Sequence, residues 1–506
     1  MMTRMFDAAW AVILVLFFAV PAGASDASSE QKSFMFEAID KNADQLAIIG
    51  DSLFYFGELG MQEFETAKFL KGTLEGIGFK VETGLAGIPT AIWAKWGSGR
   101  PVVVIATEFD ALPEGSQTAG FVGRKPLVEG APGHMEGHNT HAAVAVGAAY
   151  AVKKVMEQYK IPGTVAICFG PAEEQLMSRP YIVRAGYFKD VDATIIIHIG
   201  NSLATSYGIR NYALIGAKFT FHGKTAHASV DPWDGKDAVD AVELMDIGFD
   251  KLREHLKPTY RAHRAITMGG IQPNVIPDTG QIWWFVRDAS GPAAKETYDK
   301  LVNIGKGAAL MTGTTMEIEP FGAAWPQLGN KVIGEEIQRN IEIVGMPKWS
   351  DEDNKLAKEV QKLIGAKQVG LNTKVSPFRA GTQTTSSNDI GDITWNVPSG
   401  LLSFPSNGPG VQAHNWSAGI LPATSIAHKG EVAGAKVLAA SLLDLLTSPE
   451  LIQKAKAQFQ EDTKETKYFS LLPPDAKPPL DLNREMMEKY RAEMREFYLN
   501  KKVQFK

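Results

Sequence analysis

Histidine and carboxylate side chains gather in a few short segments of this chain. Residues 133–141 read Gly-His-Met-Glu-Gly-His-Asn-Thr-His, and the adjacent Glu173 and Glu174 follow an apolar run and a Gly-Pro turn. His198 ends another apolar run, and His414 lies in a polar loop. Zinc and similar divalent metals take imidazole and carboxylate ligands from separate segments, and the same groups transfer protons. These segments are therefore candidates for one metal-dependent catalytic site.

The surrounding pattern predicts a sheet edge on which these residues meet. Short apolar runs predict buried strands at 90–94, 102–106, 164–169 and 193–198. Helical periodicity predicts helices at 33–56, 63–77, 141–159 and 432–446. Strands that alternate with helices predict an α/β fold with a largely parallel sheet flanked by helices. Because the carboxyl ends of parallel strands share one edge, we expect Glu108, Asp110, Glu174 and His198 to converge there.

The pattern changes near residue 212 and returns near residue 325. Between these points, strands and helices are predicted in the order β-α-β-β-α-β, which is a split βαβ sandwich. We therefore expect a discontinuous catalytic domain (25–211 and 325–470), an inserted domain (212–324) and a C-terminal extension (471–506). The inserted domain exposes one sheet edge, where a second copy can pair, and clefts between domains commonly hold active sites.

Composition and charge argue against several classes of protein. The chain has 506 residues, 44% of them hydrophobic and 22% charged, which excludes disorder along its whole length. A net charge of −5 argues against a broad surface for nucleic acid. The single cysteine, Cys168, excludes an intramolecular disulfide and a cysteine-cluster metal site.

The N-terminal segment predicts export. The apolar run 8–20 follows Arg4 and is shorter than the ~20 residues that span a bilayer. Ala22-Gly23-Ala24 then provides a cleavage pattern, so residues 1–24 are predicted to be a signal peptide, with an uncleaved anchor as the alternative. We therefore expect a periplasmic or secreted protein without a stable membrane anchor after cleavage.

Several motifs in register from about residue 46 to residue 440 resemble one family. They are Glu-Leu-Gly-Met-Gln-Glu (58–63), Glu-Phe-Asp-Ala-Leu-Pro (108–113), the segment 133–141, Pro-Ala-Glu-Glu (171–174), His198, Gly-Lys-Thr-Ala-His-Ala (223–228), Pro-Asn-Val-Ile-Pro-Asp (273–278) and His414. Together they resemble the aminoacylase/carboxypeptidase-G-type family of co-catalytic zinc amidohydrolases, and within it the branch of the p-aminobenzoyl-glutamate hydrolases. The resemblance implies a zinc-peptidase-like fold whose inserted domain forms a homodimer.

The resemblance implies a site for two divalent metal ions per subunit. The matching ligands are His138, Glu174, His198 and His414; taken singly, each is open to a purely structural interpretation. Zinc is favoured, with manganese or cobalt as alternatives. Where this branch commonly has a metal-bridging cysteine, the chain has Glu136, which we expect to bridge the metals through its two oxygens. The alternative for Glu136 is a side chain that points to solvent beside one metal.

Other matches imply roles in proton transfer and orientation. Glu173 matches the general base that takes a proton from the attacking water, with a solvated acidic pair as the alternative. Asp110 matches a carboxylate that orients a metal-ligating imidazole, with a turn-forming role as the alternative. His141 is equally open to an orienting and a helix-capping role, and His134 is expected to be structural.

Three matches lie in the inserted domain. His227 matches a histidine that reaches the partner subunit's active site and stabilises the oxyanion, with a surface loop histidine as the alternative. Asn274 and Arg287 match groups that bind polar ends of the substrate, and a surface ion pair is the alternative for Arg287. His222, His255, His263 and His428 receive no functional role.

These observations predict a metal-dependent hydrolase that cleaves a small-molecule amide, namely an N-acyl or N-aroyl amino acid or a dipeptide-like substrate with a free carboxylate. The rival is a non-catalytic dimeric subunit that binds amino-acid conjugates and kept the fold, for which the altered position Glu136 is the best support. A third alternative is a catalytic subunit whose partner is a different chain.

Overall fold

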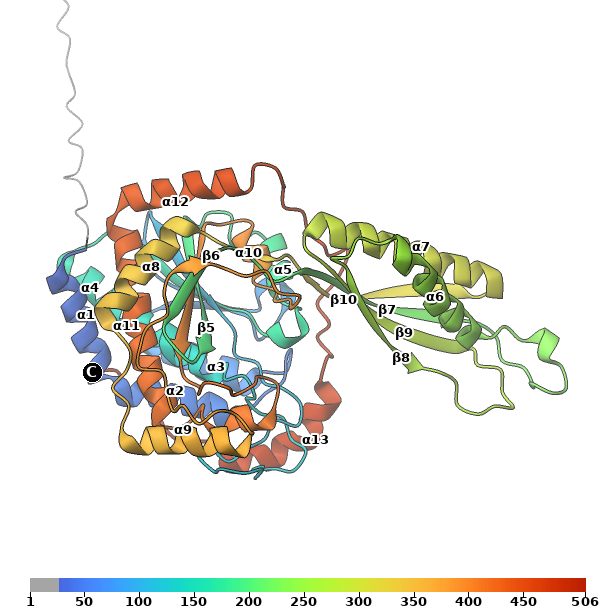
Figure 1. The fold of residues 1–506 in the computed structure, drawn as a ribbon, viewed down its shortest axis with the longest axis horizontal. Helices are drawn as coiled ribbons and strands as arrows, with labels where there is room; N and C mark the ends of the chain where they lie inside the picture. The colour runs from blue at the N-terminus through green and yellow to red at the C-terminus, as the bar shows by residue number, and fades with distance from the viewer. Residues whose placement is uncertain (1–26) are drawn as a thin grey trace, which may run out of the picture.

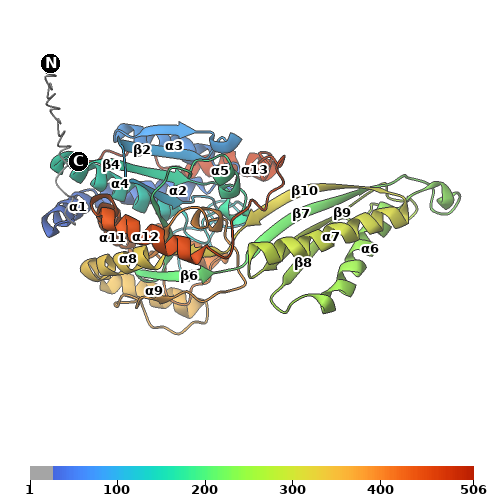
Figure 2. The same ribbon diagram turned by 90° about the horizontal axis from the view of Figure 1, so that it is seen from above.

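The computed structural model describes residues 27–506. The predicted signal peptide, residues 1–24, lies outside the described residues. A large rounded part carries both ends of the described chain, and a narrower part projects from it (Figures 1 and 2). The narrower part is formed by β7 to β10 with two helices, so the chain leaves the large part once and returns to it.

The large part is built on one mixed sheet. Its strands are β1 (Lys80–Thr83), β2 (Ile92–Ser98), β3 (Val102–Thr107), β4 (Gly163–Phe169), β5 (Ala193–Gly200), β6 (Ala204–Arg210), β11 (Gln327–Gly329), β12 (Arg379–Ala380) and β13 (Ser399–Pro405). They lie in the order β1-β2-β4-β3-β5-β13-β6-β11, with β12 beside β6. The four central strands β4, β3, β5 and β13 are parallel, and antiparallel strands extend the sheet on both sides. The predicted fold class is confirmed.

The large part contains helices that cover both faces of this sheet. They are α1 (Ser29–Lys41), α2 (Ala43–Phe56), α3 (Phe64–Gly76), α4 (Asn139–Tyr159), α5 (Arg179–Arg184), α8 (Lys331–Val344), α10 (Gly391–Thr394), α11 (Ser425–Thr447) and α12 (Pro449–Asp462). Two further helices, α9 (Asp351–Leu363) and α13 (Arg484–Met494), pack against loops. Along β3, Val103 and Ile105 pack into the core with α2, α4 and α11, whereas Val104 and Ala106 pack into the core with α5 and α10. Burial on both faces explains why the central strands are nearly continuous in apolar residues.

The projecting part is a four-stranded antiparallel sheet with two helices. Its elements are β7 (Ala213–His222), α6 (Ala238–Leu252), β8 (Arg261–Met268), β9 (Thr279–Asp288), α7 (Gly291–Thr312) and β10 (Thr315–Ala324). The strand order is β10-β7-β9-β8, so β8 lies at a free edge. Both helices pack on one face of the sheet (Figure 2). The predicted β-α-β-β-α-β order is confirmed, and the predicted bounds 212–324 enclose all six elements.

Some elements differ from the sequence prediction. The helix predicted over 33–56 is two helices. The first one ends at Asn42, because the side-chain amide of Asn42 donates a hydrogen bond back to the Ala38 carbonyl. The central strand β13 was not predicted, because its apolar stretch is short and is flanked by prolines. Among the described helices, none alone is long and apolar enough to span a membrane. Taken together, α11 and α12 have sufficient length and apolar composition, but they meet at a bend of 96°.

Candidate metal centre and active site

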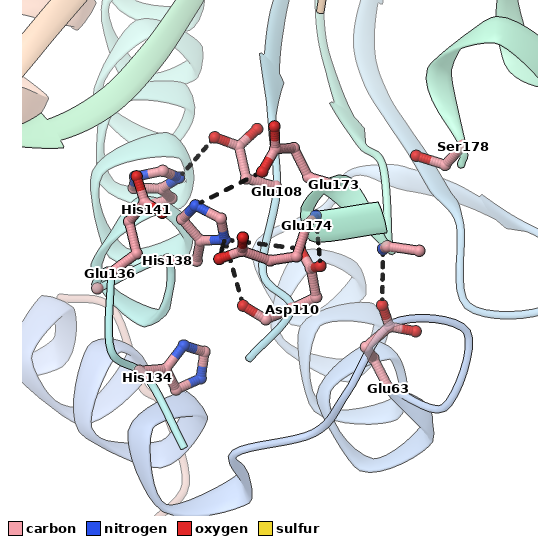
Figure 3. A network of polar contacts seen from close by, with 12 residues as sticks. Glu63, Glu108, Asp110, His134, Glu136, His138, His141, Glu173, Glu174 and Ser178 are labelled. Atoms are coloured by element: carbon pink, nitrogen blue, oxygen red, sulfur yellow. Dashed lines mark hydrogen bonds and ion pairs between the residues drawn. The ribbon is translucent and has the colours of Figure 1, made fainter. Parts of the chain in front are cut away.

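The loops that follow the central strands bring the predicted residues together. Glu108 and Asp110 follow β3, Glu173 and Glu174 follow β4, and His198 lies near the end of β5. His138 caps α4 after Gly137, whose φ is +101°. This φ favours glycine, and a Cβ there would also lie 2.3 Å from Cδ1 of Ile199. Figure 3 shows Glu108, Asp110 and Glu174 close together, and Nε2 of His198 lies 3.9 Å from Oε1 of Glu108, so the expected convergence at the sheet edge is present.

Glu136 lies between two groups of possible metal ligands. Its Oε1 is 3.4 Å from Nε2 of His198, and its Oε2 is 2.8 Å from Nε2 of His414. His414 Nε2 also lies 3.2 Å from Oε2 of Glu174. Two sets of ligand atoms that can each hold an ion share Glu136: one with His138 and His198, the other with Glu174 and His414. The two carboxylate oxygens thus face different sets, and Glu136 does not point away from the site.

His138 is oriented by Asp110. Its Nδ1 is 3.2 Å from the backbone carbonyl of Asp110 and 3.5 Å from Oδ1 of that residue. Its Nε2 is buried, has no hydrogen-bond partner among the described residues, and faces Oε2 of Glu173 at 4.0 Å. A ring that donates through Nδ1 presents Nε2 as a metal ligand, which is the usual arrangement for a ligating histidine.

His141 has an orienting position rather than a capping one. Its Nε2 accepts a hydrogen bond from the Ile199 amide at 2.9 Å, and its Nδ1 lies 3.2 Å from Oε1 of Glu108. Burial lowers the pKa of His141 to about 3, so the ring is neutral, and because Nε2 accepts from Ile199 its proton is on Nδ1, the nitrogen that faces Glu108. The hydrogen bond to the Ile199 amide therefore fixes the ring with Nδ1 toward Glu108.

The carboxylates make the centre favourable for positive charge. Burial alone would raise the pKa of Glu136, but the hydrogen bond with His414 and the nearby His198 and His138 lower it to about 2. Burial alone would lower the pKa of His138, but Asp110 and Glu174 raise it well above its usual value. Burial raises the pKa of Glu174 to about 8, so Glu136 is the carboxylate of this group whose charge the surrounding imidazoles stabilise. A divalent cation would stabilise the carboxylate charges in the same way as a protonated imidazole does.

Glu173 has the environment of a proton acceptor. It is 6% exposed, and burial together with the charges of Glu174 and Glu108 raises its pKa well above the usual value. Ala172, before it, has φ of +53°, and the turn Glu173–Gln175 directs the two glutamates differently. Glu174 reaches the His414 side of the site, while Glu173 faces His138.

Buried ligand atoms that lack hydrogen-bond partners among residues 27–506 show that this site suits a pair of metal ions. In the described part of the chain, Nε2 of His138 and Oε1 of Glu174 are buried without a hydrogen-bond partner. Leaving such atoms unpaired is costly unless something binds there. Their chemistry, imidazole nitrogen and carboxylate oxygen, suits zinc and also manganese or cobalt.

A cavity of about 1090 Å³ connects this centre to the inserted domain. Glu136, Glu173, Glu174, His198 and His414 line one end, and Arg287 of β9 lines the other. His227 and Asn274 are exposed in loops of the inserted domain, and neither lines this cavity within one chain. Within one chain, Arg287 thus lines the same cavity as the predicted residues of the catalytic part, whereas His227 and Asn274 do not.

Three buried residues that support the site, Glu63, Arg179 and Asp389, were not assigned a role from the sequence. Glu63 accepts hydrogen bonds from the Ala172 amide at 2.9 Å and the Thr90 hydroxyl at 3.0 Å, which fixes the start of the glutamate loop. Arg179 is 1% exposed and pairs with both Glu108 and Asp389. Glu108 had a positional signal at the end of a strand, but nothing in the sequence joins Arg179 to Asp389.

Comparisons with known proteins identify the family of the chain. Peptidase family M20/M25/M40 matches residues 104–423. One of the p-aminobenzoyl-glutamate hydrolase subunits of Escherichia coli is 32% identical over 472 residues, which cover 88% of this chain and 98% of that protein. The Xaa-Arg dipeptidase of Mus musculus is 26% identical over 438 residues, covering 84% and 91% of the two chains.

A solved structure shares the fold. The aminobenzoyl-glutamate utilization protein from Klebsiella pneumoniae aligns with a TM-score of 0.56 at 18% identity, over 81% of this chain and 98% of that one. The motifs at the sheet edge lie within the matched range 104–423, and the relative from Escherichia coli extends the similarity over most of the chain. The resemblance drawn from the motifs is therefore confirmed: the chain belongs to peptidase family M20/M25/M40.

Proposed function

We propose that this hydrolase uses two metal ions to cleave the amide bond of an N-acyl or N-aroyl amino acid, or of a dipeptide-like molecule, with a free carboxylate. One observation carries the proposal: Glu136 turns one oxygen to each of two ligand sets, and Glu173 lies beside them. The names of the relatives, an aminobenzoyl-glutamate hydrolase and a dipeptidase, support an amide substrate.

His138 and His198 would hold one metal, Glu174 and His414 the other, and Glu136 would contact both. When bound, such a pair polarises the substrate carbonyl and makes a water molecule more acidic. Asp110 keeps the His138 ring in the orientation that leaves Nε2 available. Glu108 and His141 pack behind His138 and His198 and hold their position.

Glu173 would move the proton. A carboxylate with a raised pKa accepts a proton from the attacking water and then delivers it to the amide nitrogen as the bond breaks. The raised pKa of Glu173, which follows from its burial, suits both halves of this transfer. Glu173 lies beside His138 and also lines the cavity, which supports this role.

His227 would complete the site from a second copy of the chain. Its Nδ1 accepts hydrogen bonds from the amides of Ser229 and Val230, each at 3.2 Å. A neutral ring that accepts at Nδ1 carries its proton on Nε2, so it presents a donor to an oxyanion. The exposed loop position of His227 and the free edge of β8 both favour a homodimer through the inserted domain. An exported location, periplasmic or secreted, remains part of this proposal.

The test combines metal loading with a substrate panel. Protein stripped by a chelator is reloaded with zinc, manganese or cobalt and incubated with N-acyl amino acids and dipeptides. The matched variant is Glu173→Gln, which is isosteric and spares the ligands. We expect hydrolysis by the loaded wild type and a loss of at least ~10²-fold in the variant with unchanged metal content.

The outcomes separate the alternatives. Near-normal turnover by Glu173→Gln would refute the role of Glu173. Tight binding of the conjugates without hydrolysis by any metal form would favour the non-catalytic binding protein. Activity that appears only with a second, different chain recovered by co-purification would favour a heteromeric enzyme.

A further inference from the structure

The cavity at the metal centre is lined by an unusual set of side chains. Sites for small organic ligands are lined mainly by apolar and aromatic side chains, with few polar groups. Here, ten serine and threonine residues line the cavity, whereas Phe285 is its one phenylalanine, tyrosine or tryptophan among residues 27–506. Eight of these ten lie on β6 (Ala204–Arg210) or in residues 376–388, which together form a hydroxyl wall on the large part of the molecule.

Backbone hydrogen bonds hold residues 376–388 against β6. Within this segment, β12 pairs with β6 in parallel. Beyond β12, the Gly381 amide donates to the Tyr207 carbonyl at 2.7 Å. The Tyr212 amide, just after β6, donates to the Ser386 carbonyl at 2.8 Å. The hydroxyl wall is therefore attached to the sheet at both ends of the segment, and its side chains have defined positions along the cavity.

Two hydroxyls of this wall are buried without a partner. Thr205 of β6 is 6% exposed, and its Oγ1 has no hydrogen-bond partner among the described residues. The same holds for Oγ of Ser387. A buried hydroxyl that has lost its bonds to water and gained none is unfavourable unless something binds there. Because both residues line the cavity, a bound molecule can supply the missing hydrogen bonds.

Thr164 of β4 shows the usual arrangement of a buried hydroxyl in the same sheet. Its Oγ1 donates to the Gly99 carbonyl at 2.9 Å, and it lies outside the cavity. Thr107, which precedes Glu108 at the end of β3, is the other strand residue of this sheet with a buried hydroxyl unpaired in residues 27–506. The fold thus supplies a partner at Thr164, whereas it supplies none at Thr205, where a ligand can reach.

We propose that the hydroxyl wall binds the acyl group of the substrate, and that this group is polar, with several hydrogen-bonding oxygens, rather than aromatic. This inference rests on the proposed amide hydrolysis. Serine and threonine hydroxyls both donate and accept hydrogen bonds, so they suit ligand hydroxyls and carbonyl groups alike. Arg210 and Arg379 lie on the same wall and add N–H donors for ligand oxygens.

The size of the cavity agrees with an extended acyl group. Its volume of about 1090 Å³ is at the upper limit of the ~300–1,000 Å³ that ligand sites usually span, which leaves room for more than a benzoyl group. Two kinds of acyl group combine this size with several hydrogen-bonding oxygens, namely the acyl group of a sugar acid and a short peptide.

The test varies the acyl group on one amino acid. N-gluconoyl-L-alanine and N-hexanoyl-L-alanine have the same six-carbon acyl chain, with and without hydroxyls. Glycylglycyl-L-alanine represents the peptide source, and N-benzoyl-L-alanine represents the aromatic alternative. We expect kcat/KM for one of the two polar compounds to exceed the values for the hexanoyl and benzoyl compounds by at least about 10-fold. The polar compound that is preferred identifies the source.

Thr205→Val removes the unpaired hydroxyl with little change in shape. We expect it to lower kcat/KM for the preferred polar compound by about 3- to 10-fold and to leave the hexanoyl compound unaffected. The matched control, Thr164→Val on β4, should keep the ratio of the two. Urea unfolding gives a readout that a purely structural hydroxyl would move: Thr164→Val should lower the midpoint because it loses a hydrogen bond, whereas Thr205→Val should not.

A binding measurement separates this inference from the proposed function. Calorimetric titration of the gluconoyl, glycylglycyl and hexanoyl compounds into Glu173→Gln protein, with and without Thr205→Val, reports affinity without turnover. A preference for a polar compound that shrinks with Thr205→Val supports the inference even if wild type hydrolyses none of them, in which case the proposed function fails alone. No preference for a polar compound in either measurement, or an equal loss for polar and hexanoyl compounds in Thr205→Val, would overturn the inference while hydrolysis itself stands.

Discussion

The two regions that carry site residues differ in how much of the site one chain completes. In the large part, imidazoles and carboxylates from the ends of three central strands converge, and most of them are buried. In the inserted part, Arg287 lines the same cavity, while His227 and Asn274 remain in exposed loops. The site residues of the large part are thus brought together by the hydrophobic core of one chain. Those of the inserted part would complete a site only if a ligand or another chain bound there.

The difference also appears in how charges are balanced. Arg179 is buried between Glu108 and Asp389, with its Nη1 2.9 Å from Oδ1 of Asp389. Asp389 further accepts the amides of Ser178 and Arg179. Among residues 27–506, Nε of Arg287 is buried without a hydrogen-bond partner, and Arg261 donates only to the backbone carbonyls of Pro258 and Tyr260. A buried charge must be matched by the fold itself, whereas a charge at a cavity wall can be matched by a ligand.

The largest expected effect concerns the buried charges. Arg179→Met leaves Glu108 and Asp389 as uncompensated buried carboxylates, so we expect a loss of about 3–5 kcal/mol in the free energy of unfolding. The control Arg264→Gln removes a partly exposed pair of the inserted part and should cost no more than about 1 kcal/mol. Urea unfolding of both variants measures the contrast. Similar losses would show that the two regions do not differ in this way.

His227→Ala tests whether the inserted region acts on a second copy. We expect activity to fall about 10²- to 10³-fold, the range for loss of an oxyanion donor, with unchanged metal content. Mixing this variant with Glu173→Gln under subunit exchange gives hybrids in which one site has its own Glu173 and the partner's His227. Those hybrids should regain activity that neither parent shows. Confirmed exchange without recovery would mean that His227 acts within its own chain or not at all.

Glu136→Ala addresses the centre of the first region. Two cations held close repel each other, and an anion between them offsets much of the repulsion. We therefore expect bound metal to fall from two per subunit toward one, with a smaller loss of activity in Glu136→Asp. Metal analysis after dialysis measures the stoichiometry. Two tightly held ions and full activity in Glu136→Ala would contradict the bridging role.

Local sequence patterns were sufficient for the α/β order, the βαβ insertion and the family. Apolar runs mark buried strands because both faces of the central sheet are covered, and strand ends mark Glu108, Glu174 and His198 because parallel strands share an edge. The motif resemblance added the ligand roles. The short β13 and the break at Asn42 were missed, because tertiary packing and one side-chain amide decide them rather than periodicity.

The sequence by itself determined which residue types are available and roughly where each one lies along a strand or a helix. Only the tertiary structure decided their partners. Arg179 meets Asp389 across 210 positions of chain, and Arg261 faces Arg287 because the register of β8 and β9 aligns them. Both facts depend on how separate segments pack, and the free energy of packing is shared among many distant contacts that no local pattern records.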